Sequence, residues 1–78
     1  MNPARPADPR AVVVRATPIE LSQFIKFGGL TETGGAAKQA IAEGRVLLNG
    51  VVEKRKGRKL SAGDQVTLGS QTLVVTCQ

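Results

Sequence analysis

The chain has 78 residues, a length that allows one small domain with a compact core. It contains one cysteine and no histidine. A disulfide framework is therefore excluded, and the usual general base at neutral pH is absent. Lysine and arginine number 11 against 6 acidic residues, and 5 of these cations lie between Lys54 and Lys59. Outside that stretch the chain is neutral, so its basicity is a localised patch of the kind that binds phosphate groups.

Catalytic and metal-binding chemistry has little support in the sequence. Serine and threonine hydroxyls lack a base to activate them, and the carboxylates show no paired spacing. One cysteine and scattered carboxylates are a poor ligand set for zinc. We therefore expect no catalytic residue, no metal and no cofactor, and we expect that the protein is not an enzyme. Cys77 has no neighbour in sequence that would hold a thiolate, and we interpret it as an incidental end residue.

The first part of the chain predicts an arm followed by a strand. Residues 1–10 contain three prolines and little that could be buried, which is typical of a disordered or loosely held arm. Residues 11–78 are predicted to form a single domain. Its first element is a short β-branched run at Ala11–Val14, which predicts a strand. No apolar stretch approaches membrane-spanning length and no signal peptide is indicated, so we expect a cytoplasmic protein without membrane contact.

A first helix is predicted to begin at Thr17. Thr17 can cap it, Pro18 suits the first helical position, and Glu20 stands where a capping box places its acid. One apolar face at helical spacing is formed by Leu21, Phe24, Ile25 and Phe27. Gly28-Gly29 ends the helix. The two phenylalanines are the only aromatic residues and are predicted to lie in the core, so an aromatic platform for base stacking is not expected.

A second helix is predicted from Thr33-Gly34-Gly35 to a cap at Gly44. Its apolar stripe has small side chains that permit close approach to the first helix: Ala37, Ala40 and Ile41. The glycine pair leaves backbone N–H groups open to an anion, with Lys38 one turn further on. A loop glycine pair and a solvated lysine explain the same residues, and for this pair alone we favour that interpretation. A nucleotide-binding P-loop is excluded, because the glycine-lysine-hydroxyl ending is missing.

Asn49-Gly50 is the dipeptide favoured by two-residue type I′ hairpin turns. A turn there places Leu48 opposite Val51 and Arg45 opposite Lys54. Like charges directly opposite each other destabilise a hairpin. Five cations follow in six positions: Lys54, Arg55, Lys56, Arg58 and Lys59. A bulky polyanion across this corner would remove the repulsion, whereas a solvated charged loop is the alternative interpretation.

After the cations, the chain predicts a closing hairpin. Leu60 returns to the core, and residues 61–64 form a turn that contains Gly63-Asp64. Residues 65–68 and 72–76 then alternate or run apolar, as two paired strands would.

This order of elements resembles the RNA-binding domain named after ribosomal small-subunit protein four, here called the S-four domain. The resemblance covers about Ile19 to Val75. It is carried by Leu21, Phe24, Ile25, Gly29-Leu30, Ala37, Lys38, Ile41, Gly44, Val46, Asn49-Gly50, Lys59-Leu60 and Gly63-Asp64. The chain is most similar to the stand-alone bacterial subfamily of YbcJ and YaaA type. The resemblance implies an α+β fold in which two packed N-terminal helices precede a small, mainly antiparallel sheet.

The resemblance also implies a non-catalytic protein that binds structured RNA, ribosomal or transfer RNA, through the second helix and the hairpin-loop surface. The RNA-binding residues that it implies are Lys26, Thr33, Lys38, Arg45, Asn49, Lys54, Arg55, Lys56, Arg58 and Lys59. Many members have a serine-arginine pair where this chain has Gly34-Gly35, so its RNA target could differ. We expect a monomer, open to ribosome association, with no small-molecule substrate.

Two alternatives stay open. In the first, the protein is an adaptor whose basic loop docks on an acidic protein surface. In the second, it is a DNA-associated accessory protein, because phosphate contacts alone do not separate DNA from RNA.

Overall fold

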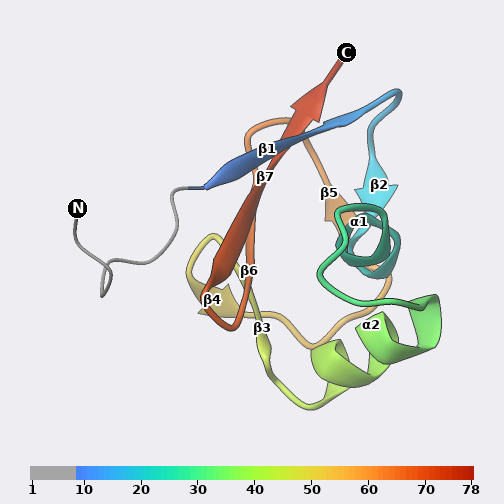
Figure 1. The fold of residues 1–78 in the computed structure, drawn as a ribbon, viewed down its shortest axis with the longest axis vertical. Coiled ribbons are helices and arrows are strands. Elements are labelled where there is room, and N and C mark those ends of the chain that lie inside the picture. Colours follow the sequence, from blue (N-terminus) through green and yellow to red (C-terminus); the bar gives the residue numbers. More distant parts are fainter. Residues whose placement is uncertain (1–8) are drawn as a thin grey trace.

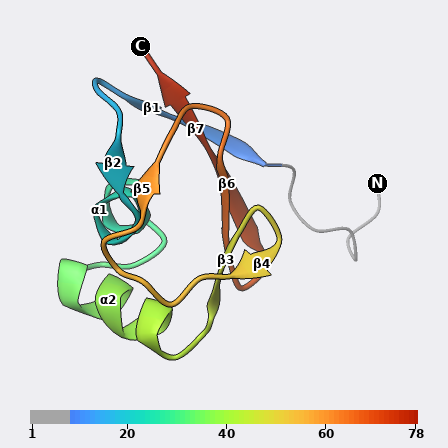
Figure 2. The same cartoon turned by 180° about the vertical axis from the view of Figure 1, so that it is seen from behind.

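The structure, a computed structural model, describes residues 9–78, which form two helices and two β-sheets. The helices are α1 (Leu21–Phe27) and α2 (Gly34–Ala42). The strands are β1 (Arg10–Val14), β2 (Ile19–Glu20), β3 (Val46–Leu48), β4 (Val51–Val52), β5 (Lys59–Leu60), β6 (Gln65–Leu68) and β7 (Gln71–Cys77). Both helices lie to one side of the larger sheet (Figure 1 and Figure 2).

The larger sheet is mixed, with the strand order β1-β7-β6-β3-β4. β1 pairs in parallel with β7, and the other three neighbouring pairs are antiparallel, in keeping with the mainly antiparallel sheet that was predicted. β2 and β5 form a separate antiparallel pair in which Ile19 lies opposite Leu60. The core joins both helices to the strands through Val14, Leu21, Phe24, Ile25, Ala37, Ala40, Ile41, Val46, Leu48, Leu60, Val66, Leu73 and Val75.

The predicted α+β class is confirmed, but the prediction that the helices are N-terminal is wrong. β1 and β2 both precede α1. The run at Ala11–Val14 is a strand, as predicted, and it starts one residue earlier at Arg10. It belongs to the sheet because it buries one face against the core, where Val14 is almost fully buried and Val12 is partly buried. Residues 1–8 of the predicted arm lie outside the described residues.

α1 begins at Leu21, four residues later than predicted. Thr17 and Pro18 are joined by a cis peptide bond, and the next two residues form β2. Glu20 occupies the N-cap position without a side-chain cap hydrogen bond. The first two helical N–H groups, on Leu21 and Ser22, instead donate to the loop carbonyls of residues 58 and 56 at 2.8 and 3.2 Å. A distant segment thus satisfies donors that a local cap would otherwise satisfy.

Phe27 does not belong to the core, so that prediction is also wrong. Phe24 is fully buried, whereas the Phe27 side chain is 64% exposed. A helical stripe that contains Leu21, Phe24 and Ile25 continues at residue 28 rather than 27, because residues three, four and seven apart share a face. Gly28 is buried there, and a Cβ atom at this position would overlap with the side chain of Leu73.

α2 and the hairpin agree with the sequence-based prediction. The Thr33 hydroxyl accepts a hydrogen bond from the Ala36 N–H at 3.0 Å and caps α2. Asn49 and Gly50 both have positive φ, at 52° and 85°, as a type I′ turn requires. Leu48 lies opposite Val51 in the resulting β3-β4 pair. Within residues 9–78, neither helix is long and apolar enough to cross a membrane.

Candidate nucleic-acid interface

The segment Lys54–Lys59, here called the basic loop, joins β4 to β5 and is held at both ends. β4 pairs with β3 in the larger sheet, and Lys59 and Leu60 pair with β2. Between these ends, the two carbonyls that accept from the start of α1 hold the middle of the loop against the helix. Figure 2 shows the chain running from β4 past α2 to β5, which lies beside α1. The five cations therefore stand on a backbone with defined anchors.

Glu53 is the acidic centre of this surface. It is only 8% exposed, and its carboxylate accepts two hydrogen bonds from the Arg55 guanidinium at 2.9 and 3.1 Å. The Arg55 backbone N–H and the Arg58 guanidinium each donate to the same carboxylate at 3.1 Å. The Arg55 hydrogen bonds, aided by the charges of both arginines, lower the pKa of Glu53 to about 2. The carboxylate in turn raises the pKa of Arg55.

The Glu53 carboxylate with Arg55 and Arg58, here called the clamp, orients both guanidinium groups without using all their N–H donors. A guanidinium has five N–H groups in a planar fork. Arg55 places two nitrogen atoms on Glu53 and Arg58 places one. The side chains of Arg55 and Arg58 stay 71% and 43% exposed. Their outward N–H groups can therefore bind an anion while the inward groups keep the side chains in place.

The lysines of the basic loop divide into paired and unpaired groups. Lys59 donates to Glu20 at 3.1 Å, across the β2-β5 pair. In the described part of the chain, no carboxylate oxygen lies within 4 Å of Lys54 or Lys56. Five cations with two partner carboxylates leave a net charge of +3 on this surface. The least compensated positive charges are thus those of the two exposed lysines.

The structure places Lys26 and Lys38 on exposed positions of α1 and α2, respectively. Neither has a carboxylate partner within 4 Å among residues 9–78. Arg45 differs, because its guanidinium pairs with Glu43 at 3.2 Å. The expected opposition of Arg45 and Lys54 does not occur within paired strands, because β4 ends before residue 54.

Two other predicted RNA-binding side chains serve the fold. The Thr33 hydroxyl caps α2. Asn49 accepts a hydrogen bond from the Gln65 N–H at 2.9 Å through its side-chain oxygen, and it donates to Asp64 at 3.2 Å. Its side chain therefore ties the hairpin turn to the start of β6. Sequence reasoning missed Glu53, although a lone acid directly before a run of cations was the available signal.

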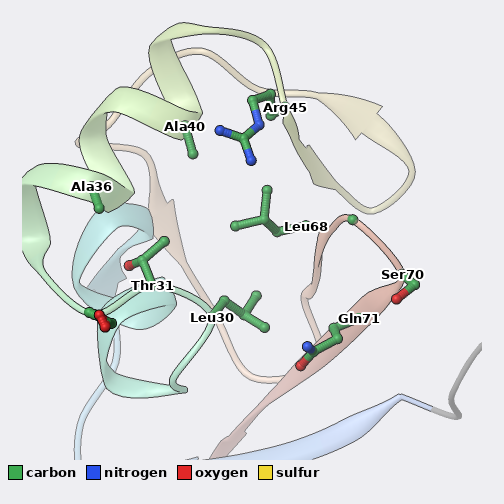
Figure 3. A pocket seen from close by; sticks show the side chains of 10 residues that line it. Leu30, Thr31, Ala36, Ala40, Arg45, Leu68, Ser70 and Gln71 are labelled. Carbon is green, nitrogen blue, oxygen red and sulfur yellow. The ribbon is translucent and has the colours of Figure 1, made fainter.

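Arg45 lines a separate open groove of about 790 Å³ between α2 and the β6-β7 turn (Figure 3). Leu30, Ala40 and Leu68 supply apolar walls, and Gln71 supplies a carboxamide. None of the residues that line this groove belongs to the basic loop. Arg45 thus lines a groove outside the basic loop, while the Lys54 side chain packs beside the neighbouring Gly44. No cluster of three metal-ligating side chains is found in residues 9–78.

The fold and this surface define a small α+β domain of a known class. Residues 12–76 match the model of the family described as the S4 domain, and the chain belongs to that family. This is the S-four domain that the sequence resembles, so the resemblance is confirmed. Two curated bacterial proteins are similar to the chain. The Escherichia coli (strain K12) protein named "Putative RNA-binding protein YbcJ" is 42% identical over 57 residues, which cover 73% of this chain and 81% of YbcJ.

The second relative is the Bacillus subtilis (strain 168) protein named "Probable ribosome maturation protein RlbA". It is 42% identical over 50 residues, which cover 64% of this chain and 70% of RlbA. Solved structures show the same fold. The solution structure of E. coli YbcJ, described as revealing a motif involved in RNA-binding, has a TM-score of 0.69 and 34% identity over 97% of this chain and 98% of YbcJ. The trimeric structure of Vibrio cholerae heat shock protein 15 has a TM-score of 0.66 at 21% identity, over 76% and 63% of the two chains.

Proposed function

We propose that the protein binds structured RNA, without catalysis, through the basic loop and the adjoining exposed faces of α1 and α2. The observation that carries this proposal is the anchored basic loop, which presents a net charge of +3 on a backbone fixed to α1. Clustered cations on one surface are the electrostatic footprint of phosphate binding. Membership of the S4 domain family, together with the names of YbcJ and RlbA, supports RNA as the source of those phosphates.

The chemistry of the surface suits folded RNA. Double-stranded RNA is recognised through phosphates, 2′-hydroxyls and shape rather than through base edges in its deep groove. Lysines bind phosphate as point charges, and arginine forks bind it in a defined orientation. The basic loop carries both residue types and no aromatic side chain. Ribosomal RNA is our favoured target, which the name of RlbA supports, and a cytoplasmic protein that works beside the ribosome is part of this proposal.

The predicted site residues take different roles in this proposal. Direct phosphate contacts are assigned to seven exposed cations: Lys26, Lys38, Lys54, Arg55, Lys56, Arg58 and Lys59. Thr33 and Asn49 support the surface through their hydrogen bonds within the protein. Arg45 contacts RNA only if a phosphate replaces Glu43 as its partner.

The test replaces Lys54 and Lys56 together with serine. Both are exposed and have no carboxylate partner in residues 9–78, so the fold should persist. Affinity for a fragment of ribosomal RNA should fall on the order of 10-fold or more at low salt, and the log–log salt slope should become shallower by about 1.5. Fluorescence anisotropy at several salt concentrations measures both. Unchanged binding by the folded double variant would overturn the proposed interface.

A matched control separates the site from overall charge. Lys56→Ser and Arg15→Ser each remove one exposed cation. Arg15 lies in the β1-β2 connection, which the two views show at the opposite end of the molecule from the basic loop (Figure 1 and Figure 2). We expect Lys56→Ser to weaken RNA binding and Arg15→Ser to leave it nearly unchanged. Equal losses would mean that binding follows net charge rather than this surface.

The same titrations distinguish the alternatives. Duplex DNA of matched length tests the DNA-associated role, and polyglutamate tests docking on an acidic protein surface. We expect RNA to bind more tightly than either at physiological salt. Equal affinity for DNA would favour the DNA-associated role, and tighter binding of polyglutamate would favour the adaptor.

A further inference from the structure

The outer face of α1 carries an aromatic side chain that the fold does not use. Phe27 is the last residue of α1 and is 64% exposed, although it is one of only two aromatic residues in the chain. The core stripe of this helix passes through Leu21, Phe24 and Ile25 to the buried Gly28. Phe27 therefore points to the other side of the helix. A single exposed apolar residue needs no explanation by itself, but Phe27 also stands among polar and charged side chains that line a groove with it.

Phe27 lines a shallow groove of about 280 Å³ together with Ile19, Gln23 and Lys26. Gln23, Lys26 and Phe27 lie on the exposed side of α1, and Ile19 is the first residue of β2, two residues before the helix. They bring together an aromatic ring, an aliphatic wall, a carboxamide and an ammonium group. No carboxylate lines the groove. A ligand with a flat apolar face, a hydrogen-bonding edge and a negative charge would match all four side chains.

The charge at this end of α1 is positive. Lys26 has no carboxylate partner within 4 Å in the described part of the chain. Arg10 adds a second positive charge at this end of the helix, where its guanidinium donates to the Gly28 carbonyl at 2.7 Å. Lys26 in the groove, with no carboxylate in its lining, favours an anionic ligand over an apolar protein surface. A nucleotide has the required combination of π face, polar base edge and phosphate.

The groove is continuous with the basic loop. Ile19 lies opposite Leu60 in the β2-β5 pair, directly after the last cation of the loop, and Glu20 binds Lys59. β2 and β5 lie beside the start of α1 in both views (Figure 1 and Figure 2). A seven-residue helix at 1.5 Å per residue is about 10 Å long. Phe27, at the far end of the helix, therefore lies about 10 Å from the turn of α1 that contacts the loop.

We propose that the outer face of α1 is a site for one unpaired base of the bound RNA. The base stacks on the Phe27 ring, Gln23 contacts its polar edge, and Lys26 binds the adjoining phosphate. This proposal rests on the proposed RNA-binding function. It narrows the RNA that the protein binds to folded RNA with an unpaired nucleotide next to a double-helical segment. Base–aromatic stacking tolerates any base, so the site selects for an exposed base rather than for a sequence.

The Phe27→Trp variant tests the stacking directly. The chain contains no tryptophan or tyrosine, so emission from this variant reports on residue 27 alone. The probes are a synthetic RNA hairpin with one bulged adenosine and the same hairpin without the bulge. We expect the bulged hairpin to quench the tryptophan emission as it binds, and the fully paired hairpin to bind with little quenching. Anisotropy of labelled RNA measures binding independently in the same samples.

The Phe27→Ala variant tests the contribution to affinity. We expect its affinity for the bulged hairpin to fall about 5- to 100-fold, with little change for the paired hairpin. Val13→Ala is the matched control, because Val13 is an exposed apolar residue on β1 at 50% exposure. Both variants should keep the native melting temperature.

The outcomes separate this proposal from the one on which it rests. If RNA binds but emission at residue 27 does not change, the stacking site is wrong and the RNA-binding function stands. Equal losses of affinity for both hairpins would also overturn base stacking. If emission changes with protein concentration in the absence of RNA, the face is an interface between copies of the chain. If the native protein binds neither hairpin nor ribosomal RNA, the proposed function itself fails.

Discussion

The carboxylate of Glu53 contacts both arginines of the basic loop, and this limits how the loop can be altered. Removing Arg55 and Arg58 would leave a nearly buried carboxylate without its partners, which is costly in proteins. A variant that loses all five loop cations would therefore change the stability of the fold as well as RNA affinity. For this reason, the double variant at Lys54 and Lys56 is the cleaner probe of the surface.

The lowered pKa of Glu53 predicts how stability depends on pH. A carboxyl group whose pKa falls from 4.5 to about 2 on folding contributes stability above pH 4.5 and loses it as the pH falls toward 2. The Glu53→Gln variant lacks this titrating group. We therefore expect the difference in free energy of unfolding between native protein and variant to be constant above about pH 5 and to shrink below pH 4.5.

Urea unfolding between pH 3 and pH 7 measures this difference. Glu43→Gln is the control, because Glu43 belongs to an exposed ion pair with Arg45. That variant should keep the pH dependence of the native protein. If Glu53→Gln also keeps it, the clamp does not contribute to folding in the way described.

At the scale of elements, the β3-β4 hairpin depends on the backbone conformation of its turn. Gly50 has a φ of 85°, where β-branched side chains are strained. We expect Gly50→Val to destabilise the protein by about 1 kcal/mol or more, and RNA binding to weaken because the basic loop follows directly. Gly57→Val is the matched control in the loop, where the backbone is not left-handed and a Cβ meets no atom within 4 Å. Thermal melting compares them, and equal melting temperatures would contradict the turn assignment.

Two glycine substitutions, one at the end of α1 and one at the start of α2, should change the free energy of unfolding in opposite directions. At Gly28, a Cβ would overlap with the buried Leu73 side chain, so Gly28→Ala should cost about 1–3 kcal/mol through overpacking. At Gly35, near the start of α2, a Cβ would meet only the Thr33 hydroxyl, at an ordinary contact distance of 4.0 Å. Gly35→Ala should therefore stabilise the protein by about 0.5–1 kcal/mol through helix propensity. Chemical denaturation of both variants provides the comparison, and a stabilising Gly28→Ala would refute the packing of α1 described here.

The elements that could be predicted are those whose signals are local. The type I′ turn at Asn49-Gly50 and the start of α2 at Thr33-Gly34-Gly35 depend on neighbouring residues, and both were predicted correctly. The start of α1 could not be predicted, because its first N–H groups are satisfied by carbonyls more than 30 residues away. The exposure of Phe27, by contrast, could have been predicted, because helical spacing from Leu21, Phe24 and Ile25 favours residue 28 rather than 27 for the core face.

For the molecule as a whole, the charge on one surface predicts how binding responds to salt. If four to six cations contact phosphates, the slope of log affinity against log salt concentration should be roughly −3 to −5. Binding to a ribosomal RNA fragment between 50 and 300 mM salt measures this slope. A nearly flat response would instead indicate an apolar interface and contradict the proposed use of the basic loop.

The candidate site was predictable as a set of cations but not as an arrangement. The density of charge in Lys54–Lys59 is visible in the sequence. The partners that decide which charges are free come partly from distant positions, as Glu20 does for Lys59 across 39 residues. The hydrogen bonds of Asn49 to residues 64 and 65 are likewise set by the pairing of β3 with β6. Tertiary structure therefore decides which predicted residues can meet RNA.

The position of β7 in the sheet has a consequence for the order in which the protein can be made. β7 lies between β1 and β6, yet among the strands of this sheet it is the last to be synthesised. Until β7 is synthesised, β1 has no neighbouring strand in the sheet. The pairing of β1 with β7 closes a loop of about 60 residues. Such distant contacts form late, because the entropy of loop closure is lost before the new contacts stabilise the chain. The anchors of the basic loop in α1, β2 and β3 all precede it in the chain, so the cationic segment can be held in place while β1 still waits for its only partner in the sheet.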